Sequence, residues 1–203
     1  MTSLHCSSNW SPIYIVDLLL SNGADVNEEN DTGCIPLHAA AANGSLEIVQ
    51  KLINQESDVN KMADNGWTPL HAAVQSGRLD VVRNMISHGA TKTRFEGMTV
   101  LYIAAQRGHI DLIEYFGTTG CDVNDGTDSG KTPLLAACYN GALDSVEMLV
   151  TQDACINHAD RNKRTPVHAA AKEGHLPVVT YLVENGADTN AKDTDGITPL
   201  QAA

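Results

Sequence analysis

Apolar residues recur at helical spacing in short blocks along the chain. Steps of three or four residues place the members of a block on one face of a helix. Two such blocks are Leu79-Val82-Met85-Ile86 and Leu176-Val179-Leu182-Val183. A shorter block with a pair of small residues, such as Ala40-Ala41, precedes each of them. The pattern predicts pairs of short helices separated by turn-rich segments without helical period, such as 188–196.

One phrase opens the first helix of each pair. Its clear copies are Ile35-Pro36-Leu37-His38, Thr68-Pro69-Leu70-His71, Thr132-Pro133-Leu134-Leu135, Thr165-Pro166-Val167-His168 and Thr198-Pro199-Leu200-Gln201. Degenerate copies are Thr99-Val100-Leu101-Tyr102 and Thr2-Ser3-Leu4-His5. The starts lie 33 residues apart, except for one interval of 31. A fixed period of this length indicates a repeat protein whose units stack on their neighbours.

The residue types of the phrase explain the predicted unit. Threonine is a good N-cap, and proline is favoured at the first helical position. A glycine nine residues after the start, as at Gly44 and Gly174, can take the left-handed conformation that ends a helix. A second glycine, as at Gly23 and Gly186, ends the second helix. Each unit is therefore predicted to be helix, turn, helix and projecting hairpin.

These phrases and their period resemble the ankyrin repeat, and the resemblance covers essentially the whole chain. It implies an all-α ankyrin-repeat solenoid of helix-turn-helix units with projecting β-hairpin fingers. We expect one domain over residues 1–203. Its repeats are predicted at 1–34, 35–67, 68–98, 99–131, 132–164 and 165–197, with a partial seventh at 198–203. Because that last copy stops inside its opening helix, we expect the chain to be a piece of a longer array.

Three departures from the repeat pattern are concentrated in the middle and towards the end of the chain. Repeat 68–98 is two residues short, which predicts a stubbier finger. The next repeat has Val100 for proline, Tyr102 for histidine, and Gly117 where its second helix should carry a larger apolar residue. Lys163 replaces the hairpin glycine of the other fingers. We expect the stack to be weakest at the junction of the third and fourth repeats.

Charge and composition narrow the classes of partner. The net charge of −12 and pI near 4.9 argue against nucleic-acid binding, which needs a positive surface. No apolar run has the length of a membrane span, since Asp17 interrupts Ile13–Leu20. The five cysteines form no CxxC pair, which is typical of structural or incidental thiols in a reducing compartment. We expect a monomeric intracellular protein, cytoplasmic or nuclear, without direct membrane insertion.

Candidate chemistry is sparse. No Ser/His/Asp or Cys/His context, glycine-rich phosphate loop or calcium-loop pattern is present in the sequence. His38, His71 and His168 could suggest a metal site, but they lie one repeat or more apart. The resemblance implies that this histidine forms hydrogen bonds within and between hairpins. We therefore predict no enzyme activity, no catalytic residue, no cofactor and no bound metal.

The resemblance implies that a partner protein binds in a concave groove lined by the hairpin tips and the first helices. Mapped onto this chain, the candidate contacts are Trp67, Phe95, Met98, Arg107, Lys131, Tyr139, Arg161 and Arg164. Tryptophan, tyrosine and arginine are also the residue types enriched among binding hot spots. The alternative interpretation is that Trp67 packs against a neighbouring hairpin and that the basic residues are simply solvated.

Two function classes follow. The first is an intracellular protein–protein interaction module. The alternative is a structural or elastic segment excised from a longer array, such as a membrane–cytoskeleton linker or the N-terminal region of a channel.

A modification is also implied by the resemblance. Asn27, Asn60, Asn157 and Asn190 share the hairpin position that asparaginyl hydroxylase modifies in similar repeats, and each has a leucine eight residues earlier. Asn124 has Phe116 there and is ranked lowest. The alternative is that these asparagines only form hydrogen bonds in the turn.

Overall fold

The computed structural model describes residue 4 and residues 13–203. The sequence copy at 2–5, apart from the buried Leu4, and Cys6 lie outside the described residues. Contacts divide the chain into two compact units, residues 1–95 (unit 1) and residues 96–203 (unit 2). The units are described separately, and the predicted repeat boundaries stay a prediction.

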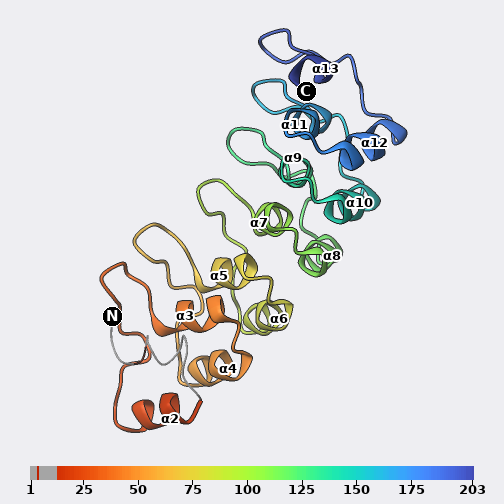
Figure 1. Cartoon of the computed structure of the whole chain (residues 1–203). Helices are drawn as coiled ribbons and strands as arrows, with labels where there is room; N and C mark the ends of the chain where they lie inside the picture. The colour runs from red at the N-terminus through yellow and green to blue at the C-terminus, as the bar shows by residue number, and fades with distance from the viewer. Residues whose placement is uncertain (1–3, 5–12) are drawn as a thin grey trace. The chain divides into compact units, whose positions relative to one another are not determined.

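Unit 1 consists of short antiparallel helix pairs joined by long loops (Figure 1). Its helices in chain order are α2 (Ile13–Ser21), α3 (Pro36–Asn43), α4 (Leu46–Asn54), α5 (Pro69–Gln75) and α6 (Leu79–Ser87). The first helices of neighbouring pairs pack on each other, as α3 does against α5. The second helices do the same, α2 against α4 and α4 against α6. The helices α3 to α6 therefore each contact both the other helix of their own pair and a neighbour in the stack.

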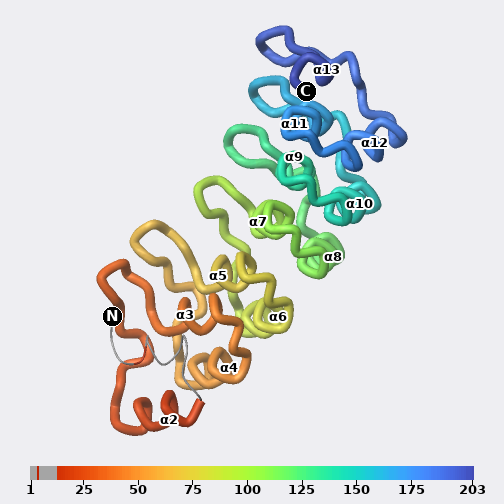
Figure 2. The backbone as a smooth tube through the Cα atoms, viewed as in Figure 1, coloured from red at the N-terminus to blue at the C-terminus, as the bar shows by residue number. Residues whose placement is uncertain are grey.

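Unit 2 has the same organisation. Its helices are α7 (Val100–Arg107), α8 (Ile110–Thr118), α9 (Pro133–Tyr139), α10 (Leu143–Thr151), α11 (Pro166–Lys172), α12 (Leu176–Glu184) and α13 (Pro199–Ala202). The first helices α7, α9, α11 and α13 form one row, and α8, α10 and α12 form a second. The loops between pairs project from the side of the first helices, away from the second helices (Figures 1 and 2).

The helix ends form as the residue types predict. The hydroxyl of Thr99 accepts a hydrogen bond from the Tyr102 N–H at 3.0 Å, and that of Thr132 from the Leu135 N–H at 3.3 Å. Gly108 ends α7 in the left-handed conformation, with φ of 75°. A side chain is disfavoured in that conformation, so glycine fixes where the helix stops.

The core relies on small and aliphatic side chains rather than aromatic rings. The alanine pairs of the first helices, such as Ala104 and Ala105, are fully buried and let neighbouring helices approach closely. The second helices contribute larger side chains, including Leu112, Phe116 and Leu149, which are also fully buried. Alanine-lined contacts explain how a chain with 4% aromatic residues forms a core within each unit.

The projecting loops are tight hairpin fingers, and backbone hydrogen bonds link neighbouring fingers within each unit, as from the Asp64 N–H to the Thr32 carbonyl in unit 1. In unit 2 the Arg161 N–H donates to the Ser129 carbonyl, and the Thr194 N–H to that of Asn162, both at 3.0 Å. Lys163 adopts φ of 57°, where Gly130 and Gly196 have 80° and 77° in the neighbouring fingers. The substitution noted in the sequence therefore places a lysine in a left-handed backbone conformation.

Two departures from the repeat have visible structural consequences. His38 reaches a carbonyl 29 residues further on, at Trp67, whereas His71 in the shortened repeat reaches Thr93, 22 residues on. In unit 2, a Cβ atom at Gly117 would collide with the carboxamide of Gln152. Since Gln152 packs there and donates to the Ile113 carbonyl at 3.5 Å, the glycine makes room for a neighbouring side chain rather than leaving a void.

Candidate functional site

A cavity of about 540 Å³ opens in unit 2 between the fingers and the first helices. We call it the unit 2 pocket, and its lining residues are Tyr102, Gln106, Lys131, Leu135, Ala136, Tyr139, Asn140, Asp160, Arg164, His168, Ala169, Lys172, Asp193, Asp195, Ile197 and Ala202.

The apolar part of the pocket comes mainly from α7 and α9. Tyr102 and Leu135 are buried, at 6% and 5% exposure, while Tyr139 at the end of α9 is 52% exposed. Burial raises the pKa of the Tyr102 phenol, so its hydroxyl stays protonated at neutral pH. Together these side chains offer two aromatic rings and an aliphatic surface to a bound group.

This apolar surface occurs where the repeats lack their histidine. At His38, His71 and His168 the Nδ1 atom accepts a backbone N–H, so Nε2 carries the proton and donates to a finger carbonyl at 3.0–3.1 Å. Tyr102 and Leu135 occupy the same position in their repeats. Neither can make both bonds, and both line the pocket instead.

The histidines themselves are structural. Both ring nitrogens of His38, His71 and His168 are engaged in hydrogen bonds, which leaves no lone pair for a metal. Burial lowers the pKa of His71, and its bond to the Thr93 carbonyl offsets this in part. Across residues 4 and 13–203, no cluster of three or more His, Cys, Asp or Glu side chains is placed to hold a metal ion.

Three basic side chains line the pocket. Lys131 and Arg164 lie at the ends of two successive fingers, and Lys172 is the last residue of α11. All three are exposed. Within the described part of the chain, Lys131 and Lys172 form no ion pair, whereas Arg164 Nε lies 3.7 Å from an oxygen of Asp193. Two full positive charges are therefore available to a ligand.

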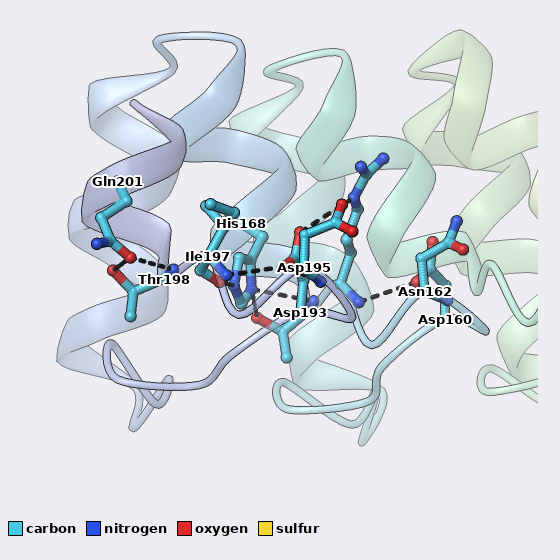
Figure 3. A network of polar contacts seen from close by, with 10 residues as sticks. Asp160, Asn162, His168, Asp193, Asp195, Ile197, Thr198 and Gln201 are labelled. Carbon is cyan, nitrogen blue, oxygen red and sulfur yellow. Dashed lines mark hydrogen bonds and ion pairs between the residues drawn. The ribbon is translucent and has the colours of Figure 1, made fainter.

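Two of the three pocket carboxylates are already used inside the fingers (Figure 3). Asp160 accepts the N–H groups of Asn162 and Arg164 at 2.8 and 2.9 Å. Asp193 accepts those of Asp195 and Ile197, both at 2.9 Å. The bond from Ile197 is the largest cause that lowers the pKa of Asp193, and Arg164 and His168 act in the same direction. These carboxylates fix the turns, and only Asp195 presents an exposed acid.

Five of the six predicted contacts in unit 2 are exposed, but only three line the pocket. Those three are Lys131, Tyr139 and Arg164. Arg107, the last residue of α7, and Arg161, at a finger tip, are exposed outside it, and the half-buried Met98 does not line it either. The structure therefore brings together half of the unit 2 candidates.

Trp67 and Phe95, the remaining candidates, belong to unit 1 and contact each other. Their ring centroids lie 4.4 Å apart in an edge-to-face arrangement, and the Trp67 ring is 5.2 Å from that of His71. Both aromatic residues are half-buried. This arrangement supports the packing interpretation of Trp67, although one part of each ring remains accessible to a partner.

The asparagines singled out for hydroxylation form a ladder between repeats. The Asn60 amide donates to the Gly89 carbonyl at 2.9 Å and accepts the Thr91 N–H at 2.8 Å. Asn27 and Asn157 make the same pair of bonds one repeat on, and so does Asn124. Among the described residues, Asn190 has no such partner for its side-chain amide. These four asparagines therefore have a structural role as hydrogen-bonding links between repeats, and hydroxylation stays a prediction.

Tyr102, Leu135, Asp193 and Asp195 line the pocket but were not predicted as contacts from the sequence. The available indication was the histidine position, since Tyr102 and Leu135 depart from the phrase in two consecutive repeats. The two aspartates gave no indication, because acidic residues occur in most of the turns.

Comparison with known proteins identifies the class. The family model described as ankyrin repeats in three copies matches residues 3–96 and 90–160, and that for ankyrin repeats in many copies matches 152–203. The chain belongs to the ankyrin repeat family, and the predicted all-α ankyrin-repeat solenoid is confirmed.

Two solved structures are similar over the whole chain. The human ASB11 ankyrin repeat domain has 25% identity and a TM-score of 0.94, and the match covers 100% of this chain and 92% of that one. The ankyrin repeat domain of Bcl-3, described as a member of the IkappaB protein family, has 24% identity and a TM-score of 0.80, with 100% and 94% covered. No relative among curated proteins matches the chain in sequence.

Family membership sets the general function. Ankyrin repeats are protein–protein interaction modules, and they are typically non-enzymatic. In the part of the chain that the structure describes, no helix has the length and apolar character that crossing a membrane requires.

Proposed function

We propose that this chain is a non-catalytic intracellular module that binds a partner protein in the unit 2 pocket. The observation that carries the proposal is the 540 Å³ cavity on the finger side of the first helices, where aromatic and basic side chains meet. Ligand sites are concave, with apolar walls and a few placed polar groups. Lys131, Tyr139 and Arg164 are the central contacts.

Other predicted residues extend this proposal. Met98, Arg107 and Arg161 are candidate rim contacts of unit 2, and Trp67 with Phe95 forms a separate apolar candidate surface on unit 1. Rim contacts contribute little affinity individually but exclude water from the centre. We propose that the chain acts as a monomer, in the cytoplasm or nucleus, and that no nucleic acid is involved, because the net charge is −12.

Site-specific photo-cross-linking in cells tests the proposal. A photoreactive amino acid replaces Tyr139 in the pocket in one variant, and in the matched control it replaces Leu176, which is 71% exposed on α12 and does not line the pocket. We expect discrete protein adducts from position 139 that are absent from position 176. They should weaken when Lys131→Glu is added.

Equal or stronger adducts from position 176 would move the binding surface to the second helices. An absence of protein adducts at both positions would instead favour the structural-segment alternative.

A further inference from the structure

We propose that the unit 2 pocket selects an acidic peptide segment that carries one large apolar side chain. This inference deepens the proposed function and rests on it, since it specifies the chemistry of the partner in that same pocket.

The size of the cavity suits a side chain and its immediate neighbours. Pockets that enclose a small ligand have volumes of roughly 300–1,000 Å³, and this cavity has about 540 Å³. It extends over parts of three fingers and four first helices. A short stretch of a partner chain can therefore contact several repeats at once.

The apolar side chain of the ligand is recognised where two histidines are missing. In the repeats that keep histidine, its ring bonds the cap of its own helix and a finger carbonyl, as His168 does with Thr165 and Ile197. At Tyr102 and Leu135 this polar bridge is replaced by a phenol ring and an aliphatic side chain. With Tyr139, they form a surface from which a large apolar side chain would displace water.

The preference for an acidic ligand follows from which charged side chains of the pocket are free to contact it. Asp160 and Asp193 are 8% and 9% exposed and accept the backbone N–H groups of their own fingers. Among the described residues, Lys131 and Lys172 form no ion pair, and the Arg164 side chain forms one, at 3.7 Å, with Asp193. A ligand carboxylate would meet two to three cations but only one exposed acid, Asp195.

The pocket charge opposes the charge of the whole chain. Arg161 and Lys163 lie on the same finger as Arg164 and extend the basic surface. The net charge of −12 acts mainly at long range, where salt screens it over about 8 Å. Contacts inside the pocket are shorter than that distance, so the local cations decide which ligand is bound.

The pocket disfavours a basic segment. Its lysine or arginine would meet Lys131 and Lys172, while the buried carboxylates could accept it only by giving up their turn hydrogen bonds. A basic ligand would therefore leave like charges facing each other, which is the usual means of rejecting a wrong partner.

Selection from a display library of random twelve-residue peptides tests the inference on the full chain. We expect enriched peptides to combine two or more Asp or Glu residues with one Phe, Tyr, Trp or Leu. The affinity of an enriched peptide, measured by fluorescence anisotropy, should fall roughly tenfold or more in the double variant Lys131→Glu, Lys172→Glu. Lys192→Glu is the control for each single charge reversal, since it makes the same change as Lys131→Glu or Lys172→Glu alone but outside the pocket, and it should alter affinity less than about twofold.

A second variant tests the apolar part without changing formal charge. In Leu135→His, the new ring is placed to bond Thr132 and the Arg164 carbonyl, 29 residues on, as in the histidine-containing repeats. We expect the variant to fold, with a melting temperature close to that of the parent chain, and to bind the enriched peptide more weakly.

The outcomes separate the two proposals. Enriched peptides that are neutral or basic, and that Leu135→His still weakens, would overturn the acidic preference and leave the pocket as a binding site. Enriched peptides that no pocket variant affects, or a library without enrichment, would overturn the inference. The cross-linking at position 139 then decides the proposed function on its own.

Discussion

Replacing Lys163 by glycine should stabilise unit 2. Lys163 has φ of 57°, and its position is fixed because its N–H donates to the Asp160 carbonyl at 2.8 Å and Asp160 in turn bonds the Arg164 carbonyl. A left-handed conformation costs a residue with a Cβ atom about 1–2 kcal/mol. Glycine removes that strain but adds unfolded-state entropy worth about 0.5–1 kcal/mol. The expected net gain is roughly 0.5–1 kcal/mol.

Lys163→Ala is the matched control, since it removes the same charge and flexible side chain but keeps the Cβ atom. Scanning calorimetry should place the melting temperature of Lys163→Gly about 1–4 °C above that of Lys163→Ala. Amide exchange within residues 160–164 should slow in the same variant. If Lys163→Gly melts at or below Lys163→Ala, the strain argument is refuted.

Four further predictions concern stability, packing, pH and modification. Hydrogen exchange should be faster at Thr99–Gly120 than at Thr165–Asn185, because Val100 replaces the proline at a helix start and Gly117 lowers helix propensity; equal protection would contradict this. Trp67→Ala should lower the free energy of unfolding by about 1–3 kcal/mol, because the ring contacts with Phe95 and His71 are lost. If the melting temperature is unchanged and binding to a partner is weakened by about 2 kcal/mol, Trp67 is a binding hot spot instead. The pKa of His71 is lower in the folded protein than in the unfolded chain, so its contribution to fold stability is fully present above the unfolded pKa of 6.5 and is lost as the pH falls below 6.5 towards the folded value. The urea midpoints at pH 7.5 and 5.5 should therefore differ less in His71→Asn than in the parent chain. An equal difference would exclude His71 as the cause. Asparaginyl hydroxylase should add oxygen to Asn190 before Asn27, Asn60 and Asn157, because the side-chain amides of those three are held by hydrogen bonds between repeats. If peptide mass analysis finds no added oxygen at any of the four sites, the modification is refuted.

The fold was predictable from sequence because its determinants are local. The Thr-Pro start, the alanine pairs and the helix-ending glycines act within one repeat and recur at a fixed period, so each copy supports the others. Apart from Lys163, left-handed positions without glycine were not predicted. Glu56 and Asp153 adopt φ of 63° and 65° at the position where other repeats have glycine after the second helix. The turn is held there by the following N–H, which donates to a helix carbonyl at 3.0 Å, from Ser57 to Leu52 and from Ala154 to Leu149.

The pocket was only partly predictable because it depends on contacts between repeats. Lys131, Tyr139 and Arg164 could be placed on the finger side from their register alone. Whether Asp193 presents its carboxylate to a ligand or to its own turn is decided by hydrogen bonds to residues 195 and 197. Likewise, Gly117 was expected to leave a packing defect, and only the structure shows that Gln152 occupies that space.

The most direct test of partner binding in the unit 2 pocket is a hydrogen-exchange footprint of the chain with and without the protein captured at position 139. Binding is predicted to slow exchange in the finger segments 127–131 and 160–164 and at the ends of α9 and α11, while α10 and α12 stay unchanged. Slower exchange confined to α8, α10 and α12, with the fingers and first helices unaffected, would contradict the account.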